Sequence, residues 1–158
     1  MSLIDDLHQI CIEKGVSISV AESCTSGLIA SKLTRKSGSS TFFKGGVVAY
    51  QNEIKINILG VNQLLIDAKT EVNEDVVNQM AEGVRKSFLA DYSIATSGYA
   101  GPTGGTINNP IGTVFIAIAN SVSTKVERFV FSGDRQSVVN QASEKSLELL
   151  YNSIKKQK

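Results

Sequence analysis

Small hydroxyl residues cluster at one junction of this chain, where an alternating apolar run ends and a helical pattern begins. The junction reads Ala21-Glu22-Ser23-Cys24-Thr25-Ser26-Gly27. A serine on a strand-to-helix turn lies beside backbone N–H groups that have no partner inside the helix and can bind an anion. Ser23 is therefore the candidate nucleophile. The alternative is that Ser23, Thr25 and Ser26 only cap the helix, as serine and threonine commonly do.

A serine nucleophile needs a partner that removes its proton, and histidine is the usual one. The single histidine, His8, falls on the polar side of the first predicted helix and leaves no ordinary Ser-His pair near any motif. Cys24 is a possible second nucleophile, although a small buried packing residue is the favoured role, and Cys11 falls in an apolar helical stripe. The two cysteines provide no metal-ligand spacing. We therefore expect neither a metal site nor a disulfide framework.

Composition narrows the possible functions further. The chain has 158 residues, which suits one compact domain over 1–158, and its 16 basic and 15 acidic residues give a net charge of +1. Such a balance does not indicate a nucleic-acid binder. The first residues lack the pattern of a secretory signal, and no apolar run approaches membrane-spanning length. We expect a cytoplasmic protein that is not bound to a membrane.

The hydrophobic pattern predicts helices and strands in alternation. Helices are expected over 3–14, 27–36, 73–89 and from Asp134 through Ile154, and Asn52 is expected to cap a short helix that ends at Leu59. Strands are expected over 17–22, 45–50 and 92–96, followed by an antiparallel hairpin of 112–119 and 126–131. This order predicts an α/β fold, a three-layer α/β/α arrangement with a mixed, mostly parallel sheet of about five strands.

In such sheets ligands bind beyond the carboxyl ends of the parallel strands. Ser23 follows the first strand, Tyr50 and Lys55 follow the second, and the glycine-rich loop 97–105 follows the third. Arg135 opens the last helix, where free N–H groups and a guanidinium suit a phosphate, although an exposed arginine would be the commoner explanation. The topology thus predicts one site assembled from distant parts of the chain.

The motifs, taken together, resemble the CinA C-terminal domain over essentially the whole chain. The resemblance is carried by five segments in register: 21–25, 45–50 with Asn52-Glu53 and Lys55, 97–102 with Gly104-Gly105, 110–114, and Phe131-Ser132-Gly133-Asp134-Arg135. It implies a nicotinamide-nucleotide amidase in its stand-alone form, which hydrolyses the carboxamide of nicotinamide mononucleotide to nicotinic acid mononucleotide and ammonia. It implies no cofactor, and a homodimer or higher homo-oligomer is expected.

The resemblance also assigns roles to individual residues. Ser23 matches the family's nucleophile, and Tyr50 and Lys55 match the residues that assist it. A desolvated lysine can act as the base that the histidine does not supply, while Tyr50 can relay the proton or donate it to the leaving nitrogen. N–H groups at the start of the helix at Gly27 are expected to stabilise the oxyanion. The expected substrate-binding residues are Glu22, Thr25, Asn52, Gly98, Ala100, Gly101 and Arg135.

Three positions depart from the family pattern. Ser26 stands where glycine is usual, which a helix start tolerates unless the position requires a positive φ. Tyr99 stands where an aliphatic residue is frequent, and Thr103 where an aspartate is frequent. Tyr99 and Thr103 fall in the loop expected to line the pocket, so we expect them to affect substrate preference more than reaction type.

Two other functions fit the same residues. The domain could act as a non-catalytic interaction module in competence or DNA-damage responses, keeping only the remains of a site. It could also be an amidase for another pyridine nucleotide or for an unphosphorylated amide. Without the resemblance, Lys55 would be interpreted as an exposed helix lysine and Tyr50 as a packed aromatic at a strand end.

Overall fold

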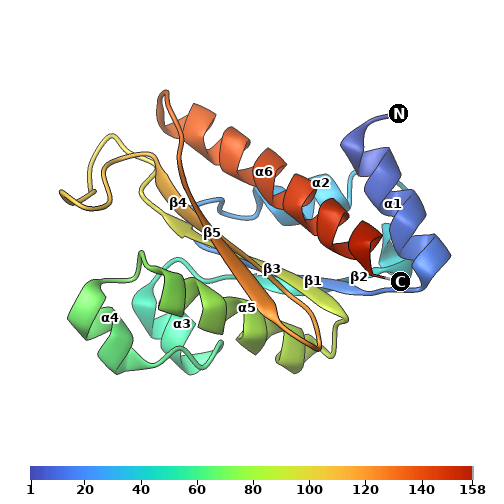
Figure 1. Ribbon diagram of the computed structural model, residues 1–158, viewed down its shortest axis with the longest axis horizontal. Coiled ribbons are helices and arrows are strands. Elements are labelled where there is room, and N and C mark those ends of the chain that lie inside the picture. The colour runs from blue at the N-terminus through green and yellow to red at the C-terminus, as the bar shows by residue number, and fades with distance from the viewer. Residues whose placement is uncertain (158) are drawn as a thin grey trace.

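A five-stranded sheet lies between two layers of helices in the computed structural model, which describes residues 1–157 (Figure 1). The strand order is β2-β1-β3-β4-β5. β1 is parallel to β2 and β3, whereas β4 is antiparallel to β3 and β5. The mixed sheet and its closing hairpin are confirmed. The strands are β1 (Ile18–Glu22), β2 (Phe43–Val48), β3 (Tyr92–Gly98), β4 (Thr113–Ala119) and β5 (Thr124–Val130).

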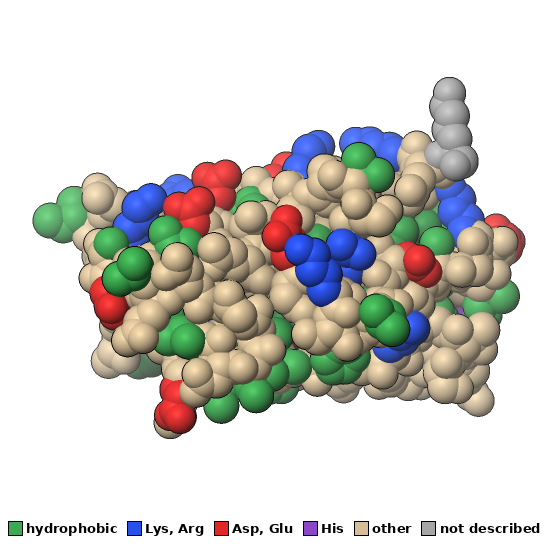
Figure 2. All heavy atoms as spheres, turned by 90° about the horizontal axis from the view of Figure 1, so that it is seen from below, with side chains coloured by type: hydrophobic (Ala, Val, Ile, Leu, Met, Phe, Trp, Pro, Cys, Tyr) green, Lys and Arg blue, Asp and Glu red, His purple; other side chains and the backbone are tan. Residues whose placement is uncertain are grey.

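The helices divide between the two faces of the sheet and confirm the three layers (Figure 1). One face carries α1 (Leu3–Lys14), α2 (Leu28–Leu33) and α6 (Arg135–Lys156). The other carries α3 (Asn52–Asn57), α4 (Gln63–Lys69) and α5 (Glu74–Phe88). Figure 2 shows this second face from outside, with small groups of basic and acidic side chains among uncharged ones. Within the described residues, this face has no extended surface that is only basic or only acidic.

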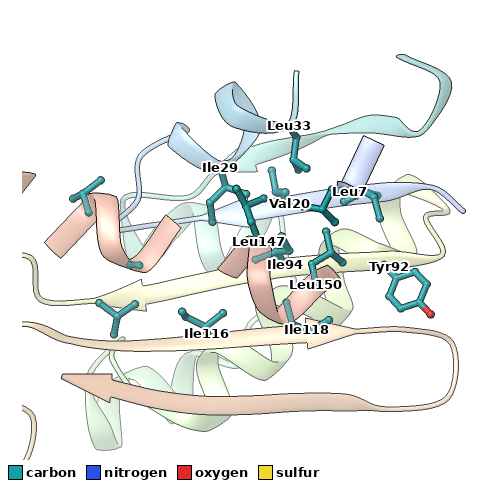
Figure 3. Packing of buried hydrophobic residues seen from close by; sticks show 14 of the residues in the cluster. Leu7, Val20, Ile29, Leu33, Tyr92, Ile94, Ile116, Ile118, Leu147 and Leu150 are labelled. Carbon is teal, nitrogen blue, oxygen red and sulfur yellow. The ribbon is translucent and has the colours of Figure 1, made fainter. Parts of the chain in front are cut away.

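Each face of the sheet buries its own apolar cluster. In the cluster on the α6 side, Leu147 and Leu150 pack above Val20, Ile94 and Ile116 of the central strands (Figure 3). Strands β1 and β4 are buried along their whole length; β4 is a nearly continuous apolar run for this reason, whereas β1 also buries the polar Ser19 and Glu22. The edge strand β2 alternates between half-buried and exposed residues. The central strands therefore form a rigid base for the loops at their carboxyl ends.

Three local expectations are corrected by the structure. Helix α4 was not expected; it begins after Asn62, whose side chain accepts from the Leu64 amide, and buries Ile66 alone, so its apolar signal is weak. Asn52 is not a cap but the first residue of α3, and the preceding Gln51 makes no side-chain capping bond. Helix α2 ends at Leu33, because the Thr34 hydroxyl donates to the Ala30 carbonyl at 2.8 Å and closes the last turn.

Glu22 fixes the start of α2 on the end of β1. Its side chain is fully buried, and its two carboxylate oxygens accept from the amides of Ile29 at 2.9 Å and Ala30 at 3.0 Å. These amides lie in the first turn of a helix and would otherwise lack partners. A carboxylate at this end also complements the helix dipole. Glu22 therefore sets the angle of the turn that carries Ser23.

Glu22→Gln should lower the free energy of unfolding by about 1–3 kcal/mol, because one of the two accepting carboxylate oxygens becomes an NH2 group, which cannot accept from the backbone N–H that faces it. Urea denaturation monitored by circular dichroism measures the change. The matched control, Glu53→Gln, removes an exposed carboxylate and should stay within about 0.5 kcal/mol. Equal effects of the two substitutions would contradict the capping role.

Candidate active site

The loops that follow β1, β2 and β3 meet at one edge of the sheet, as the topology predicts, and enclose a cavity of about 180 Å³. It brings together Ser23, Tyr50 and Lys55, the three expected catalytic residues. It also brings in Gly98, Ala100, Gly101 and Arg135 from the expected substrate-binding set. Its full lining is Ser23, Cys24, Tyr50, Lys55, Glu71, Ser97, Gly98, Tyr99, Ala100, Gly101, Thr103 and Arg135.

Ser23 sits on a turn that is anchored to the neighbouring strand. Its amide donates to the carbonyl of Thr96 at 3.2 Å, and Thr96 Oγ1 lies 2.8 Å from Thr25 Oγ1. The turn then passes through Ser26 at φ 50° and Gly27 at φ 98°. The Ser26 position therefore does require a positive φ, which costs a serine on the order of 1 kcal/mol more than a glycine. The chain accepts this strain in order to turn directly after Ser23.

The oxyanion donors expected at the start of α2 are already occupied. The Glu22 carboxylate accepts from the amides of Ile29 and Ala30. The expectation that these two amides stabilise an oxyanion is therefore wrong. One turn earlier, the amides of Cys24 and Thr25 donate to no acceptor within residues 1–157. They directly follow Ser23, and the N–H after a serine nucleophile is a common oxyanion donor. The anion-binding position therefore belongs to the turn rather than to the helix.

Lys55 is fully buried, an uncommon state for a lysine. Its Nζ donates to the carbonyl of Tyr50 at 3.3 Å, and no carboxylate within residues 1–157 lies close enough to form an ion pair with it. Burial lowers the pKa of Lys55, while the nearby Glu71 and Cys24 act weakly in the opposite direction. Desolvation thus favours the neutral amine, the form that can accept a proton.

Tyr50 and Arg135 form a hydrogen-bonded pair at the cavity mouth. Arg135 Nη2 donates to Tyr50 Oη at 2.6 Å, and Nη1 donates to the carbonyl of Gly101 at 2.7 Å. One arginine at the start of α6 therefore joins the loops after β2 and β3. Because Tyr50 Oη accepts from the guanidinium, its own proton remains available to donate.

Three expected substrate-binding residues do not line the cavity. Glu22 is fully buried against α2, and Thr25 is fully buried with its hydroxyl against Thr96. Asn52 lines a separate hollow of about 340 Å³ beside α4. Glu22 and Thr25 therefore support the nucleophile turn, and Asn52 faces a different surface.

Two cavity residues were not among the expected site residues: Glu71, and Ser97 at the start of the loop 97–105. Glu71 lies between α4 and α5, and the Ser97 hydroxyl donates to the Glu71 carbonyl at 2.8 Å. No local sequence pattern marks Glu71. It lies in the connection between α4 and α5, and because α4 was not expected, the course of that connection was not expected either. Ser97 could have been suspected only from its place at the end of β3.

A wider hollow of about 670 Å³ adjoins the cavity and shares Cys24 and Arg135 with it. Its walls come from the turn before α2 and from the first turns of α6, where Asp134 caps the helix by accepting from the Ser137 amide. The site therefore has a small inner compartment and an open outer one. Within residues 1–157 no group of three His, Cys, Asp or Glu is placed to hold a metal ion.

The fold and the site define a three-layer α/β/α protein with a serine and a buried lysine in one cavity. A family model described as the CinA C-terminal domain matches residues 1–154, and the chain belongs to this family. A CinA-like protein of Flavobacterium psychrophilum is 43% identical over 150 residues, which are 95% of this chain and 36% of that protein. A putative competence-damage inducible protein of Halothermothrix orenii is 44% identical over 135 residues, 85% of this chain and 33% of that protein.

The chain spans about a third of the length of these curated relatives. Solved structures match it over nearly their whole length. The competence damage-inducible protein A of Klebsiella pneumoniae aligns with a TM-score of 0.95 at 33% identity, covering 99% of this chain and 97% of that one. A competence/damage inducible protein of Agrobacterium tumefaciens aligns with a TM-score of 0.90 at 30% identity, covering 99% and 98%. In residues 1–157, no helix combines the length and apolarity needed to cross a membrane.

Cys24 should resist alkylation by iodoacetamide in the native protein, because burial raises the pKa of its thiol to about 12 and leaves almost no thiolate at neutral pH. Mass spectrometry of the intact protein before and after unfolding in urea measures this. Rapid modification of Cys24 in the folded chain would contradict the assignment of Ser23 as the nucleophile. Cys11, with a thiol pKa of about 12 as well, is the internal control.

Proposed function

We propose that this protein is a nicotinamide-nucleotide amidase that converts nicotinamide mononucleotide and water to nicotinic acid mononucleotide and ammonia. The observation that carries the proposal is a serine and a buried lysine without an ion-pair partner, lining one small cavity. A lysine held in its neutral form by burial is an established way to activate a nucleophile without histidine. The names of the relatives specify no reaction, so the proposal rests on this geometry and on the family resemblance of the motifs.

The two compartments match the two parts of a mononucleotide. An apolar cavity of about 150 Å³ holds one benzene molecule, so the inner cavity of about 180 Å³ suits one six-membered ring and its carboxamide. The ribose and phosphate must then lie outside, in the hollow of about 670 Å³ beside the start of α6. Arg135 stands between the two, and its guanidinium has N–H donors beyond the two that bind Tyr50 and Gly101.

The chemistry follows from the order in which the groups meet the amide. Neutral Lys55 accepts the proton of Ser23 as the hydroxyl oxygen attacks the carboxamide carbon, and the amide of Cys24, the residue that follows Ser23 and lines the cavity, stabilises the oxyanion. The C–N bond then breaks as Tyr50 or protonated Lys55 donates a proton to the leaving nitrogen. Whether the proton passes directly or through Tyr50, it comes from Lys55, which is neutral again once ammonia has left. Lys55 then takes a proton from water as the water attacks the resulting ester, and returns it to the Ser23 oxygen as the acyl–oxygen bond breaks; the carboxylic acid released ionises to the carboxylate.

A non-catalytic role in competence or damage responses is the second candidate, because the relatives are named for those responses. A fully buried lysine is costly to the fold and has no evident use in a module that only binds partners. This favours the enzyme. The expected homo-oligomer stays a prediction.

Ser23→Ala should lower ammonia release from nicotinamide mononucleotide by a factor on the order of 10³ or more, because it removes the attacking oxygen from an otherwise unchanged turn. A coupled ammonia assay, checked by chromatography of nicotinic acid mononucleotide, measures the rate. The matched control is Ser123→Ala, an exposed serine in the β4–β5 turn, which should retain full activity. A wild-type chain that releases no ammonia from this substrate would refute the proposed function.

Lys55→Arg should be nearly as inactive as Lys55→Met, because arginine keeps the positive charge but cannot lose its proton in the working range. In the wild type, kcat/KM should rise with pH as Lys55 deprotonates and level off below the ordinary range of lysine, since burial lowers its pKa. Lys55→Met should raise the free energy of unfolding, because it replaces a buried amine by an apolar side chain. An inactive variant that is more stable than the wild type has lost catalysis and not its fold.

The control for these variants is Lys125→Arg, an exposed lysine on β5, which should leave both activity and stability unchanged. A Lys55→Arg variant with most of the wild-type activity would eliminate the base and leave Lys55 as a positioning charge.

A further inference from the structure

One carboxylate lines the inner cavity within the described residues, and the proposed reaction does not use it. Glu71 shares the cavity with two basic side chains, Lys55 and Arg135. No hydrogen bond or ion pair joins its carboxylate to any group in residues 1–157. Arg135 is already bound to Tyr50 and Gly101. Glu71 therefore presents a negative charge to the cavity that the protein itself does not pair.

The backbone around Glu71 is held firmly in place. Its carbonyl accepts from the buried Ser97 hydroxyl at 2.8 Å, and the Asn73 side chain donates to the Thr70 carbonyl at 2.7 Å. Thr70 adopts φ 70°, a conformation that costs a threonine energy and is maintained only by its surroundings. This segment is thus a fixed wall of the cavity rather than a loose connection.

The same segment is joined to an aromatic ring. Thr70 Oγ1 lies 3.2 Å from Tyr99 Oη, and Tyr99 also lines the cavity. A carboxylate attracts a cation by its charge, and the face of an aromatic ring attracts one through its quadrupole. Glu71 and Tyr99 therefore give this wall the chemistry of a cation-recognition surface, in a cavity sized for one ring.

We propose that Glu71, aided by the ring of Tyr99, selects amide substrates whose aromatic ring carries a positive charge, as the pyridinium of a nicotinamide nucleotide does. This inference rests on the proposed function and adds what the inner cavity discriminates. Neutral aromatic amides of the same shape are bound less well, because they leave the half-buried Glu71 carboxylate without a partner of opposite charge. Glu71 is thus a specificity-determining residue rather than a member of the catalytic set.

The charge on Glu71 also acts on the proposed base. Glu71 raises the pKa of Lys55, against the larger effect of burial. A cationic ring beside Glu71 offsets the field of the carboxylate at Lys55. Binding of the charged substrate therefore favours the neutral amine, so the same contact that selects the ring prepares the base.

The test compares two ligands that differ only in ring charge. Nicotinamide mononucleotide and its isostere, in which a neutral 3-carbamoylphenyl group replaces the pyridinium, are titrated by calorimetry into the Ser23→Ala chain, which does not turn them over. The expected preference for the charged ring is about tenfold, the value of one charge-assisted contact. Adding Glu71→Gln should reduce the preference to within about twofold of unity, mainly by weakening the charged ligand.

The matched control is Glu74→Gln, which removes an exposed carboxylate from the first turn of α5 and should leave the preference intact. Glu71→Asp keeps the charge and should keep a preference in the same direction. Equal affinity of the Ser23→Ala chain for both ligands overturns the proposal, and this needs no variant of Glu71. An equal loss of affinity for both ligands on adding Glu71→Gln also overturns the proposal.

Failure of the proposed function is distinguishable from failure of this inference. If the wild type releases no ammonia from nicotinamide mononucleotide, the reaction is wrong whatever the binding comparison shows. If it releases ammonia but the Ser23→Ala chain binds both ligands equally, the reaction stands and the role of Glu71 is overturned.

Discussion

The burial of the Lys55 amine is the constraint on which the rest of the site depends. Taking an ammonium out of water without an ion-pair partner is costly, and the chain meets that cost through the two apolar cores on either side of its sheet. The tertiary structure holds Lys55 against the Tyr50 carbonyl, and no carboxylate within residues 1–157 forms an ion pair with it, although Glu71 lines the same cavity. A buried lysine whose pKa is lowered in this way has little structural value, which is why its position points to chemistry.

The turn after β1 shows a similar division between support and function. Glu22 uses both carboxylate oxygens to hold the first turn of α2, and Thr25 and Thr96 bind each other beneath the turn. Within residues 1–157 the amide of Cys24, directly after Ser23, makes no backbone hydrogen bond. On the far side of the cavity, Arg135 joins the loops after β2 and β3 and stands between the inner and outer compartments. The site is therefore rigid where the bond is proposed to break and open where the rest of a nucleotide would lie.

Much of this could be predicted from the sequence, because the pattern of strands fixes which loops meet. Ser23, Tyr50, Lys55 and Arg135 are far apart in the chain, yet each follows an element whose end lies at the same edge of the sheet. Glu22 was expected to bind substrate because it belongs to a segment that carries the family resemblance; only the tertiary structure shows that its carboxylate binds helix amides instead. Glu71 could not be found, because its place depends on the path between α4 and α5, and α4 buries too little apolar surface to show a helical stripe.

The most direct test of the central claim is the titration of Lys55 itself, followed by nuclear magnetic resonance of a chain labelled with ¹³C at the lysine Cε positions and assigned with Lys55→Met. One lysine signal should titrate below the others, because burial lowers the pKa of Lys55. The exposed lysines, such as Lys125, should titrate together in their ordinary range. A Lys55 signal that titrates with the exposed lysines would contradict the neutral base and the mechanism built on it.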